Sequence, residues 1–208
     1  MIALKEWSII CNALEKGDQI ILLRKGGIME YRQGFEIKHE KFFLFPTFEH
    51  QAEDAIKEKY RKSFKDIETE AVTVVEENQQ DKKEGNDNRN NQVQIKLFAQ
   101  VIYSKEFYDK KMLEKLDNYH IWTEEYIKKR MEYNPKKPMS ILLLRVYKIK
   151  QPIILNYKDA WIGCKSWIET EFDFNYDDNS KKNTLEPVFK NDDDFNKVIN
   201  NIKEMINN

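Results

Sequence analysis

The stretch that decides the fold is 20-IILLRKGG-27, a short apolar run that ends in two cations and two glycines. Ile20 to Leu23 form a continuous apolar run, which is typical of a strand covered on both faces. Arg24 and Lys25 follow directly, and Gly26 and Gly27 permit a turn or a close approach of the backbone to a ligand. The sequence therefore predicts a buried strand that delivers two cations to a corner.

A second apolar run, Ile141 to Leu144, has the same character and leads into Arg145. We expect a buried strand here too, bounded by Pro138 before it and Pro152 after it. Between the two runs, apolar and mainly polar residues alternate from Val93 to Val101, the pattern of a long strand with one buried face. Two buried strands are thus predicted to end in an arginine each.

The first part of the chain offers further elements. Helical spacing of apolar residues from Leu4 to Leu14, followed by Gly17, predicts an amphipathic helix at the start. Phe35 to Lys38 and Phe42 to Phe45 are expected to be strands, the second closed by Pro46. Thr47 is then a candidate N-cap for a helix through the residues Gln51, Ala55 and Tyr60.

The second part of the chain is richer in helices. A helix is expected around Lys105 to Leu116, and another begins after Thr123, with Trp122 and Ile127 at the positions of a hydrophobic staple. The C-terminus has an amphipathic helical pattern whose apolar face is Phe195, Val198, Ile199, Ile202 and Ile206. Strands and helices without a regular βαβ repeat predict an α+β fold, with one mixed sheet flanked by helices.

Length and composition bound the organisation of the chain. The 208 residues are enough for one sizeable core, so we predict a single domain over residues 1–208. Residues 68–92 are polar and poor in bulky side chains after Val75, which predicts a disordered loop or insertion. Without a long apolar stretch or a signal-peptide pattern, we expect a cytoplasmic protein with no membrane association. Cys11 and Cys164 are expected to be structural thiols.

The local charge is uneven although the net charge is only -1. Residues 103–150 contain twelve Lys and Arg against seven Asp and Glu. A basic middle segment is where a polyanion would be attracted. The many Lys residues are equally what an AT-rich genome would supply.

Candidate ligand-binding residues gather at the ends of the apolar runs. Arg24, Lys25, Gly26 and Gly27 suit a phosphate, because cations and exposed backbone N–H groups favour an anion. The alternative is a solvated hairpin corner. His50 and Gln51 fall in the first turn of the expected helix, where unpaired N–H groups also favour an anion. A plain surface histidine is the other interpretation.

Aromatic rings beside polar groups form a further candidate site. His120 and Trp122 lie next to each other, and Lys165 lies between Cys164 and Trp167. Such pairs can stack a base and bind its edge through hydrogen bonds. Core packing explains the tryptophans equally well.

A nuclease is the alternative enzyme hypothesis. Glu36-Ile37-Lys38 is similar to the Glu-x-Lys half of a restriction-endonuclease-like site, and Asp18 precedes it in the right order. In that hypothesis Asp18 and Glu36 hold Mg²⁺ and Lys38 is the phosphate partner. Glu-x-Lys is also frequent by chance in a chain this rich in Glu and Lys.

Several motifs together resemble the domain-of-unknown-function family 1802 (DUF1802). They are 4-LKEW-7, 22-LLRKGGI-28, 44-LFPTFEHQ-51, 120-HIWT-123, 144-LRVY-147 and 163-GCKSW-167. The resemblance covers roughly Ile2 to Ile168 and implies a bacterial or archaeal protein. It also implies a loose link to predicted restriction-endonuclease-like proteins, but no defined reaction.

Three hypotheses for function follow. The leading one is a module that binds nucleic acid or a phosphorylated small molecule. Its cleft would be formed by Arg24, Lys25, Gly26 and Gly27 with His50, Gln51 and Arg145. The second is the Mg²⁺-dependent nuclease. The third is a protein-interaction module without catalysis, which predicts that the named polar residues are scattered over the fold.

Overall fold

One curled sheet organises the protein. The computed structural model describes residues 1–25, 35–69, 92–109, 111–163, 165–174 and 185–207, and the structure is discussed for these residues. Within them, the strands form one sheet in the order β2-β5-β4-β3-β1-β6, and β7 pairs with β5. β1 and β3 run parallel, while the other pairs are antiparallel. The sheet and its helices confirm the α+β prediction.

The strands and helices are named by their labels in the figures. The strands are β1 (Ile2–Trp7), β2 (Ile21–Arg24), β3 (Lys41–Thr47), β4 (Gln92–Phe107), β5 (Met139–Asn156), β6 (Trp167–Glu169) and β7 (Leu185–Pro187). The α-helices are α1 (Ser8–Lys16), a helix over residues 61–69, α3 (Lys111–Lys115), α4 (Glu124–Glu132) and α5 (Asp192–Asn207). Short 3-10 helices are η1 (Glu53–Ala55), η2 (Glu58–Tyr60), η3 (Asp117–Tyr119) and η4 (Asp159–Trp161).

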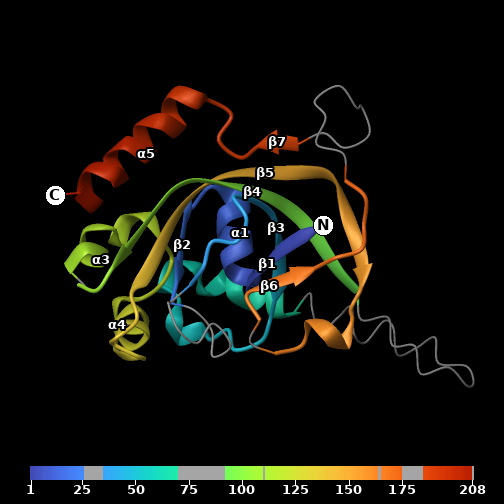
Figure 1. Cartoon of the computed structure of the whole chain (residues 1–208), viewed down its shortest axis with the longest axis horizontal. Coiled ribbons are helices and arrows are strands. Elements are labelled where there is room, and N and C mark those ends of the chain that lie inside the picture. The colour runs from blue at the N-terminus through green and yellow to red at the C-terminus, as the bar shows by residue number, and fades with distance from the viewer. Residues whose placement is uncertain (26–34, 70–91, 110, 164, 175–184, 208) are drawn as a thin grey trace, which may run out of the picture.

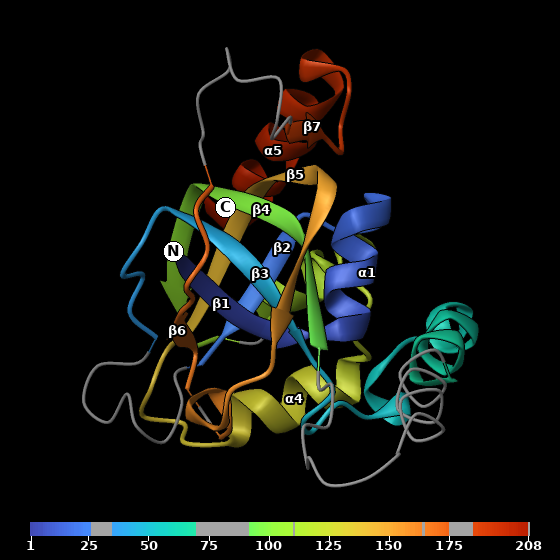
Figure 2. The ribbon, with the colours of Figure 1, turned by 90° about the vertical axis from the view of Figure 1, so that its right-hand side faces the viewer.

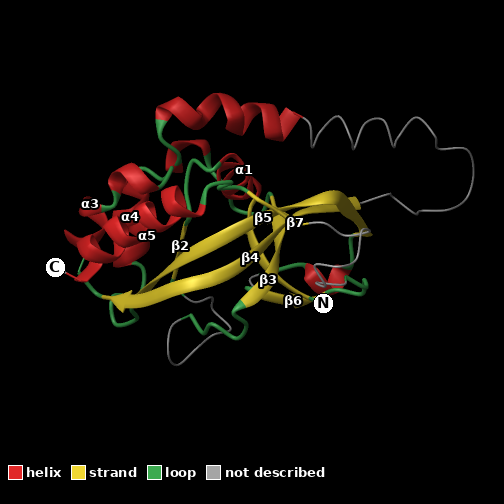
Figure 3. Ribbon diagram, turned by 90° about the horizontal axis from the view of Figure 1, so that it is seen from above, coloured by secondary structure: helices red, strands yellow, loops and turns green. Residues whose placement is uncertain are grey.

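The two longest strands set the shape. β4 has 16 residues and β5 has 18, and together they arch over α1 (Figure 1). Seen from above, α3, α4 and α5 gather towards one end of the strands (Figure 3). This end, where β5 begins, is also where β2 ends, because Arg24 pairs with Ser140.

Both faces of the sheet are buried, which explains the continuous apolar runs. Leu4 and Leu44 belong to one hydrophobic cluster together with α1 and α5. Their strand neighbours Ala3, Phe43 and Phe45 belong to a second cluster. Because successive side chains of a strand point to opposite faces, a strand between two clusters is apolar at every position.

The start of the chain differs from the prediction. Residues 2–7 form β1 instead of the first turns of a helix, and the helix α1 begins only at Ser8. Ile10, Cys11 and Leu14 do follow the helical spacing. Leu4 matches that spacing as well, but it is buried in a strand that pairs with β3 far along the chain. The helix nevertheless ends at Gly17, whose φ of 78° is left-handed.

Two predictions around β3 are also wrong. Residues 35–38 are not a strand, because Phe35 is held by side-chain packing against Trp167 and not by a backbone ladder. No α-helix begins at Thr47, which is the last residue of β3 and is held in register with Trp7. Its hydroxyl instead accepts a hydrogen bond from Glu49 N at 3.2 Å, and the chain then turns.

The strands β4 and β5 extend beyond their predicted limits. β4 continues to Phe107, so the helix expected from Lys105 is reduced to α3. β5 continues through Pro152, which was expected to end it. The ladder between β4 and β5 changes register next to this proline, between Ile95 and Leu97, so its missing N–H costs no regular ladder bond.

Two helix predictions are confirmed. Thr123 caps α4, because its Oγ1 accepts a hydrogen bond from Tyr126 N at 3.3 Å. The staple residues Trp122 and Ile127 are both buried in the core. α5 is amphipathic as expected, and its buried residues are Phe195, Ile199, Ile202 and Ile206.

Some predictions fall partly or wholly on residues that the structure does not describe. The helix over 61–69 reaches into the segment 68–92, and residues 70–91 are outside the described residues. Cys164 is also outside them, while Cys11 is buried, and this burial raises the pKa of its thiol well above the ordinary value. No helix in the described part of the chain has the length and apolar character needed to span a membrane.

A buried ion pair closes the curl of the sheet. β2 forms one edge, and β1 lies beside the short strand β6 at the other edge. Arg24 bridges them, because its guanidinium donates to Glu6 Oε2 at 3.0 Å and to the Lys5 carbonyl at 3.1 Å. The Arg24 side chain is 17% exposed and the Glu6 side chain 8%. The Phe35 ring packs on the guanidinium, 5.1 Å from its centre.

This pair is expected to be strongly coupled. Arg24→Met leaves the Glu6 carboxylate buried without its partner and should lower the free energy of unfolding by about 3 kcal/mol in urea titrations. The double variant Arg24→Met with Glu6→Gln should lose less than the sum of the two single variants. A suitable control is Lys65→Met, which breaks the exposed pair with Glu53 and should cost below about 1 kcal/mol. If the double variant instead loses the full sum of the two single losses in unfolding free energy, Arg24 and Glu6 are not coupled as the bridge requires.

Candidate functional site

A cavity of about 300 Å³ opens where Arg24 joins the two edges of the sheet. Its lining comes from the ends of β1 and β2, the turn after β3, the helix α4 and the loop before β6. α4 lies across this end of the molecule, below β1 and β2 (Figure 2). Segments that are far apart in the sequence therefore meet at one place.

The lining of the cavity contains two carboxylates that already have partners. Glu6 accepts from Arg24 and, at 2.9 Å, from the backbone N–H of Trp7. Glu49 accepts from the Lys5 ammonium at 3.1 Å. Lys5 is only 5% exposed and also donates to the carbonyls of Trp161 and Gly163, at 2.8 and 3.0 Å. Buried charges are thus paired and satisfied, as a stable site requires.

Three further cations line the same cavity without a carboxylate partner in the described part of the chain. They are Lys25, Arg130 and Lys165. Lys25 is 2% exposed and donates to the carbonyl of Met131, and Lys165 donates to the carbonyl of Ala160 at 3.3 Å. Burial and the nearby Arg130 lower the pKa of Lys25. The lining therefore holds five cations and two carboxylates, an excess of positive charge.

Aromatic rings supply much of the remaining wall. Trp7 and Tyr126 lie with their ring centroids 5.1 Å apart, and Trp122 and Tyr133 also line the cavity. Burial raises the pKa of Tyr126 to about 12, so its hydroxyl keeps its proton at neutral pH. Flat apolar rings beside unpaired cations can hold a planar group and an attached anion together.

Five of the residues predicted to bind a ligand line this cavity. They are Arg24, Lys25, His50, Trp122 and Lys165. Gly26 and Gly27 lie outside the described residues. The structure thus brings together residues that are spread over about 140 positions of the sequence.

His50 reaches the cavity in a different way from that predicted. It lies in a turn after β3, with a left-handed φ of 61°, and not at the start of a helix. The predicted helix end, with its unpaired N–H groups, is therefore not present at His50. Gln51 follows in the same turn but does not line the cavity, and among the described residues its side-chain amide has no hydrogen-bond partner.

Arg145 does not line this cavity, although it was predicted to share a cleft with Arg24. It sits in the middle of β5 instead of at a strand end and is 8% exposed. Its guanidinium donates to Asp192 Oδ1 at 2.5 Å and to the Phe189 carbonyl at 3.0 Å, and it stacks 4.3 Å from the centroid of the Phe195 ring. Arg145 therefore holds the start of α5 on the sheet and does not reach the cleft with Arg24.

His120 is also apart from the cavity. Its imidazole is buried, and neither ring nitrogen has a hydrogen-bond partner among the described residues. It borders a smaller cavity of about 100 Å³ together with Asp117 and Glu124. Burial, assisted by the Lys57 cation, lowers the pKa of His120 to about 4. His120 is therefore neutral in the folded protein at physiological pH.

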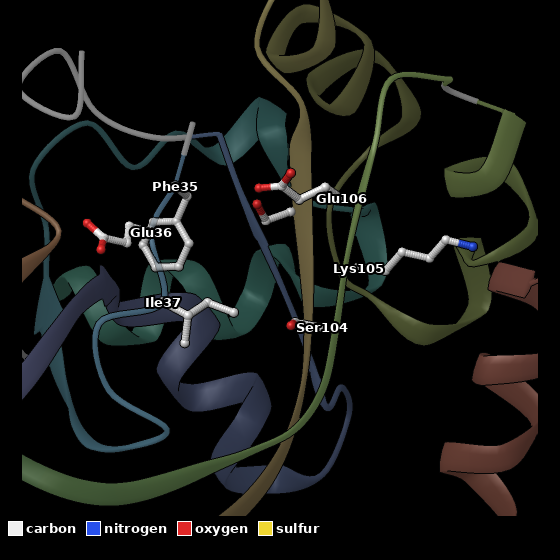
Figure 4. Close-up of a pocket in the computed structure, with 7 residues that line it drawn as sticks. Phe35, Glu36, Ile37, Ser104, Lys105 and Glu106 are labelled. Carbon is white, nitrogen blue, oxygen red and sulfur yellow. The ribbon is translucent and has the colours of Figure 1, made fainter. Parts of the chain in front are cut away.

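The residues of the nuclease hypothesis are not gathered at one site. Asp18 is exposed before β2, whereas Glu36 follows Phe35, which packs on Arg24 at the other end of β2. Glu36 borders a separate cavity of about 370 Å³, where the segment 35–37 faces Glu106 and Ser104 of β4 (Figure 4). Lys38 does not line it. No group of three or more His, Cys, Asp or Glu that could hold a metal ion occurs among the described residues.

Four important lining residues escaped the sequence analysis. Lys5 and Glu6 fall within the helix that was predicted from Leu4 to Leu14, so the prediction did not reveal their position at the end of a strand. Tyr126 and Arg130 were detectable, because residues four apart on a helix share one face. Because the cap at Thr123 was predicted, the positions of Tyr126 and Arg130 along the helix could have been related to Trp122, which precedes the cap.

The buried neutral His120 makes stability depend on pH. An unfolded chain binds a proton at His120 near pH 6.5, whereas the folded protein does so only near pH 4. Lowering the pH through this window should cost about 3 kcal/mol of unfolding free energy through this one group. We expect urea titrations at pH 7 and pH 4.5 to show a smaller loss for His120→Gln than for the wild type. If His120→Gln and the wild type lose the same unfolding free energy between these pH values, groups other than His120 cause the acid sensitivity.

The comparisons with known proteins point to one family. A family model described as a domain of unknown function, DUF1802, matches residues 3–200. Neither a curated protein nor a solved structure matches the chain. The match includes the segment from residue 169 onward, where the motifs quoted above had stopped. Because the model spans nearly all of the sequence, the chain belongs to the DUF1802 family.

Proposed function

We propose that this protein binds a ligand that carries both a phosphate and a planar ring, such as a nucleotide or a nucleotide unit of a nucleic acid. The observation that supports the proposal is the set Lys25, Arg130 and Lys165, which line one cavity without a carboxylate partner in the described part of the chain. An anion would supply that partner.

The environment of these cations strengthens the proposal. Lys25 is nearly inaccessible to water, so an anion placed beside it is screened less than at an open surface. Arg130 has no hydrogen bond or ion pair with another described residue, and its planar fork suits a phosphate. The volume of about 300 Å³ is at the lower end for a small-molecule site, which favours a compact ligand.

The arrangement of residues supports this function over the two alternatives. A protein-interaction module predicted scattered polar residues, but five of the predicted residues share one cavity. A nuclease needs Asp18, Glu36 and Lys38 together, and these residues line no common cavity in the described structure. Binding of a phosphate-bearing ligand is therefore the function that the site supports best.

Calorimetric titration with AMP, adenosine and inorganic phosphate tests the proposal. AMP should bind more tightly than either part alone, because it uses both the cations and the rings. Arg130→Gln should weaken AMP binding by about tenfold or more, since a hydrogen bond to a charged group is lost. This change should leave the fold intact, because Arg130 has no partner to lose among the described residues.

A matched control lies on the same helix. Lys128→Gln removes the same charge from an exposed position of α4 that does not line this cavity. It should change AMP affinity by less than about twofold at moderate salt, because exposed charges are well screened. Failure of AMP to bind the wild type, or equal weakening by both variants, would reject the cavity as a phosphate site.

A further inference from the structure

We infer that the cavity receives the phosphorylated end of a single nucleic-acid strand, and that the adjoining bases lie on exposed apolar side chains around its mouth. This inference rests on the proposed function and names its ligand class. It is carried by three observations, namely the exposed side chains near the cavity, the buried part of its lining and a further cation outside it.

The first observation is a group of exposed apolar side chains, which we call the rim. It consists of Phe48, Tyr133 and Ile162, whose exposed fractions are 48%, 57% and 55%. Tyr133 itself lines the cavity, and the other two are chain neighbours of the lining residues Glu49 and Gly163. Three segments that contribute to the lining thus also expose an apolar side chain each. Exposed apolar side chains near a cavity are typical of a binding surface.

The second observation is that part of the cavity lining is buried and fixed. Lys5 and Glu6 are 5% and 7% exposed, and the bonds of Arg24 and Glu49 hold them in place. With a volume of about 300 Å³, the cavity has room for about one nucleotide unit, so we expect only the end of a strand to enter it.

The third observation is a further cation outside the cavity, close to Tyr133 in the chain. Lys136 is exposed in the turn between α4 and β5, three residues after Tyr133. Single-stranded nucleic acid needs this combination, because its phosphates follow cations while its unpaired bases stack on rings. The paired bases of a duplex are not available for such stacking.

Fluorescence anisotropy with labelled six-nucleotide single strands tests the inference. The strands carry a 5′-phosphate, a 3′-phosphate or no terminal phosphate, and unlabelled AMP and a circular single strand serve as competitors. We expect a strand phosphorylated at one of its ends to bind at least about tenfold more tightly than AMP. The circular strand should compete poorly, because it has no end to insert.

Two variants separate the rim from the cavity. Phe48→Ala removes a rim ring that does not line the cavity, so it should weaken strand binding by about fivefold or more and leave AMP affinity unchanged. Tyr108→Ala is the control, since Tyr108 is 66% exposed after β4 and lines none of the cavities described above. It should change neither affinity.

The outcomes distinguish this inference from the proposed function. AMP binding that depends on Arg130, without tighter binding of any strand, overturns the inference and leaves the proposed function standing. Equal competition by circular and linear strands also overturns it, because an internal nucleotide would then be the ligand. If neither AMP nor any strand binds, both proposals fail together.

Discussion

Arg24 connects two strands that are not neighbours in the sheet, and the geometry of the cavity depends on this connection. Its guanidinium is bound to Glu6 and to the Lys5 carbonyl, so the end of β2 is fixed beside the end of β1. Lys25 follows Arg24 in the chain and is thereby placed against α4, where it donates to the Met131 carbonyl. The pairing also neutralises Glu6. The anionic ligand that we propose would therefore meet cations and not a free Glu6 carboxylate.

Much of the fold could be predicted because its signals are local. The buried runs of β2 and β5, the cap at Thr123 and the apolar face of α5 depend on spacing within one segment. β1 could not be recognised in this way. Its residues 2–7 fit a helical spacing, and only the parallel pairing with β3, about 40 residues later, makes them a strand. Likewise, Phe35 packs on Arg24 and on Trp167, and Trp167 lies more than 100 residues later in the sequence.

The site could be predicted in part for the same reason. Arg24, Lys25, His50 and Lys165 were identified as polar residues next to core segments, and the curl of the sheet brings them together. Arg145 has the same local signal, but the partner that decides its role, Asp192, lies 47 residues away. His120 was predicted to bind a ligand together with the neighbouring Trp122 ring, whereas it is buried and neutral and does not line the cavity of Arg24. A strand end indicates where a side chain leaves the core, but not which surface it reaches.

The most direct test of the account is a crystal structure of the protein grown with saturating AMP. The account predicts that the phosphate lies within hydrogen-bonding reach of Arg130 and Lys25, with the base against an aromatic wall of the cavity that Arg24 closes. AMP bound instead in the cavity beside Glu36 and Glu106, or at a site without any of these cations, would contradict it.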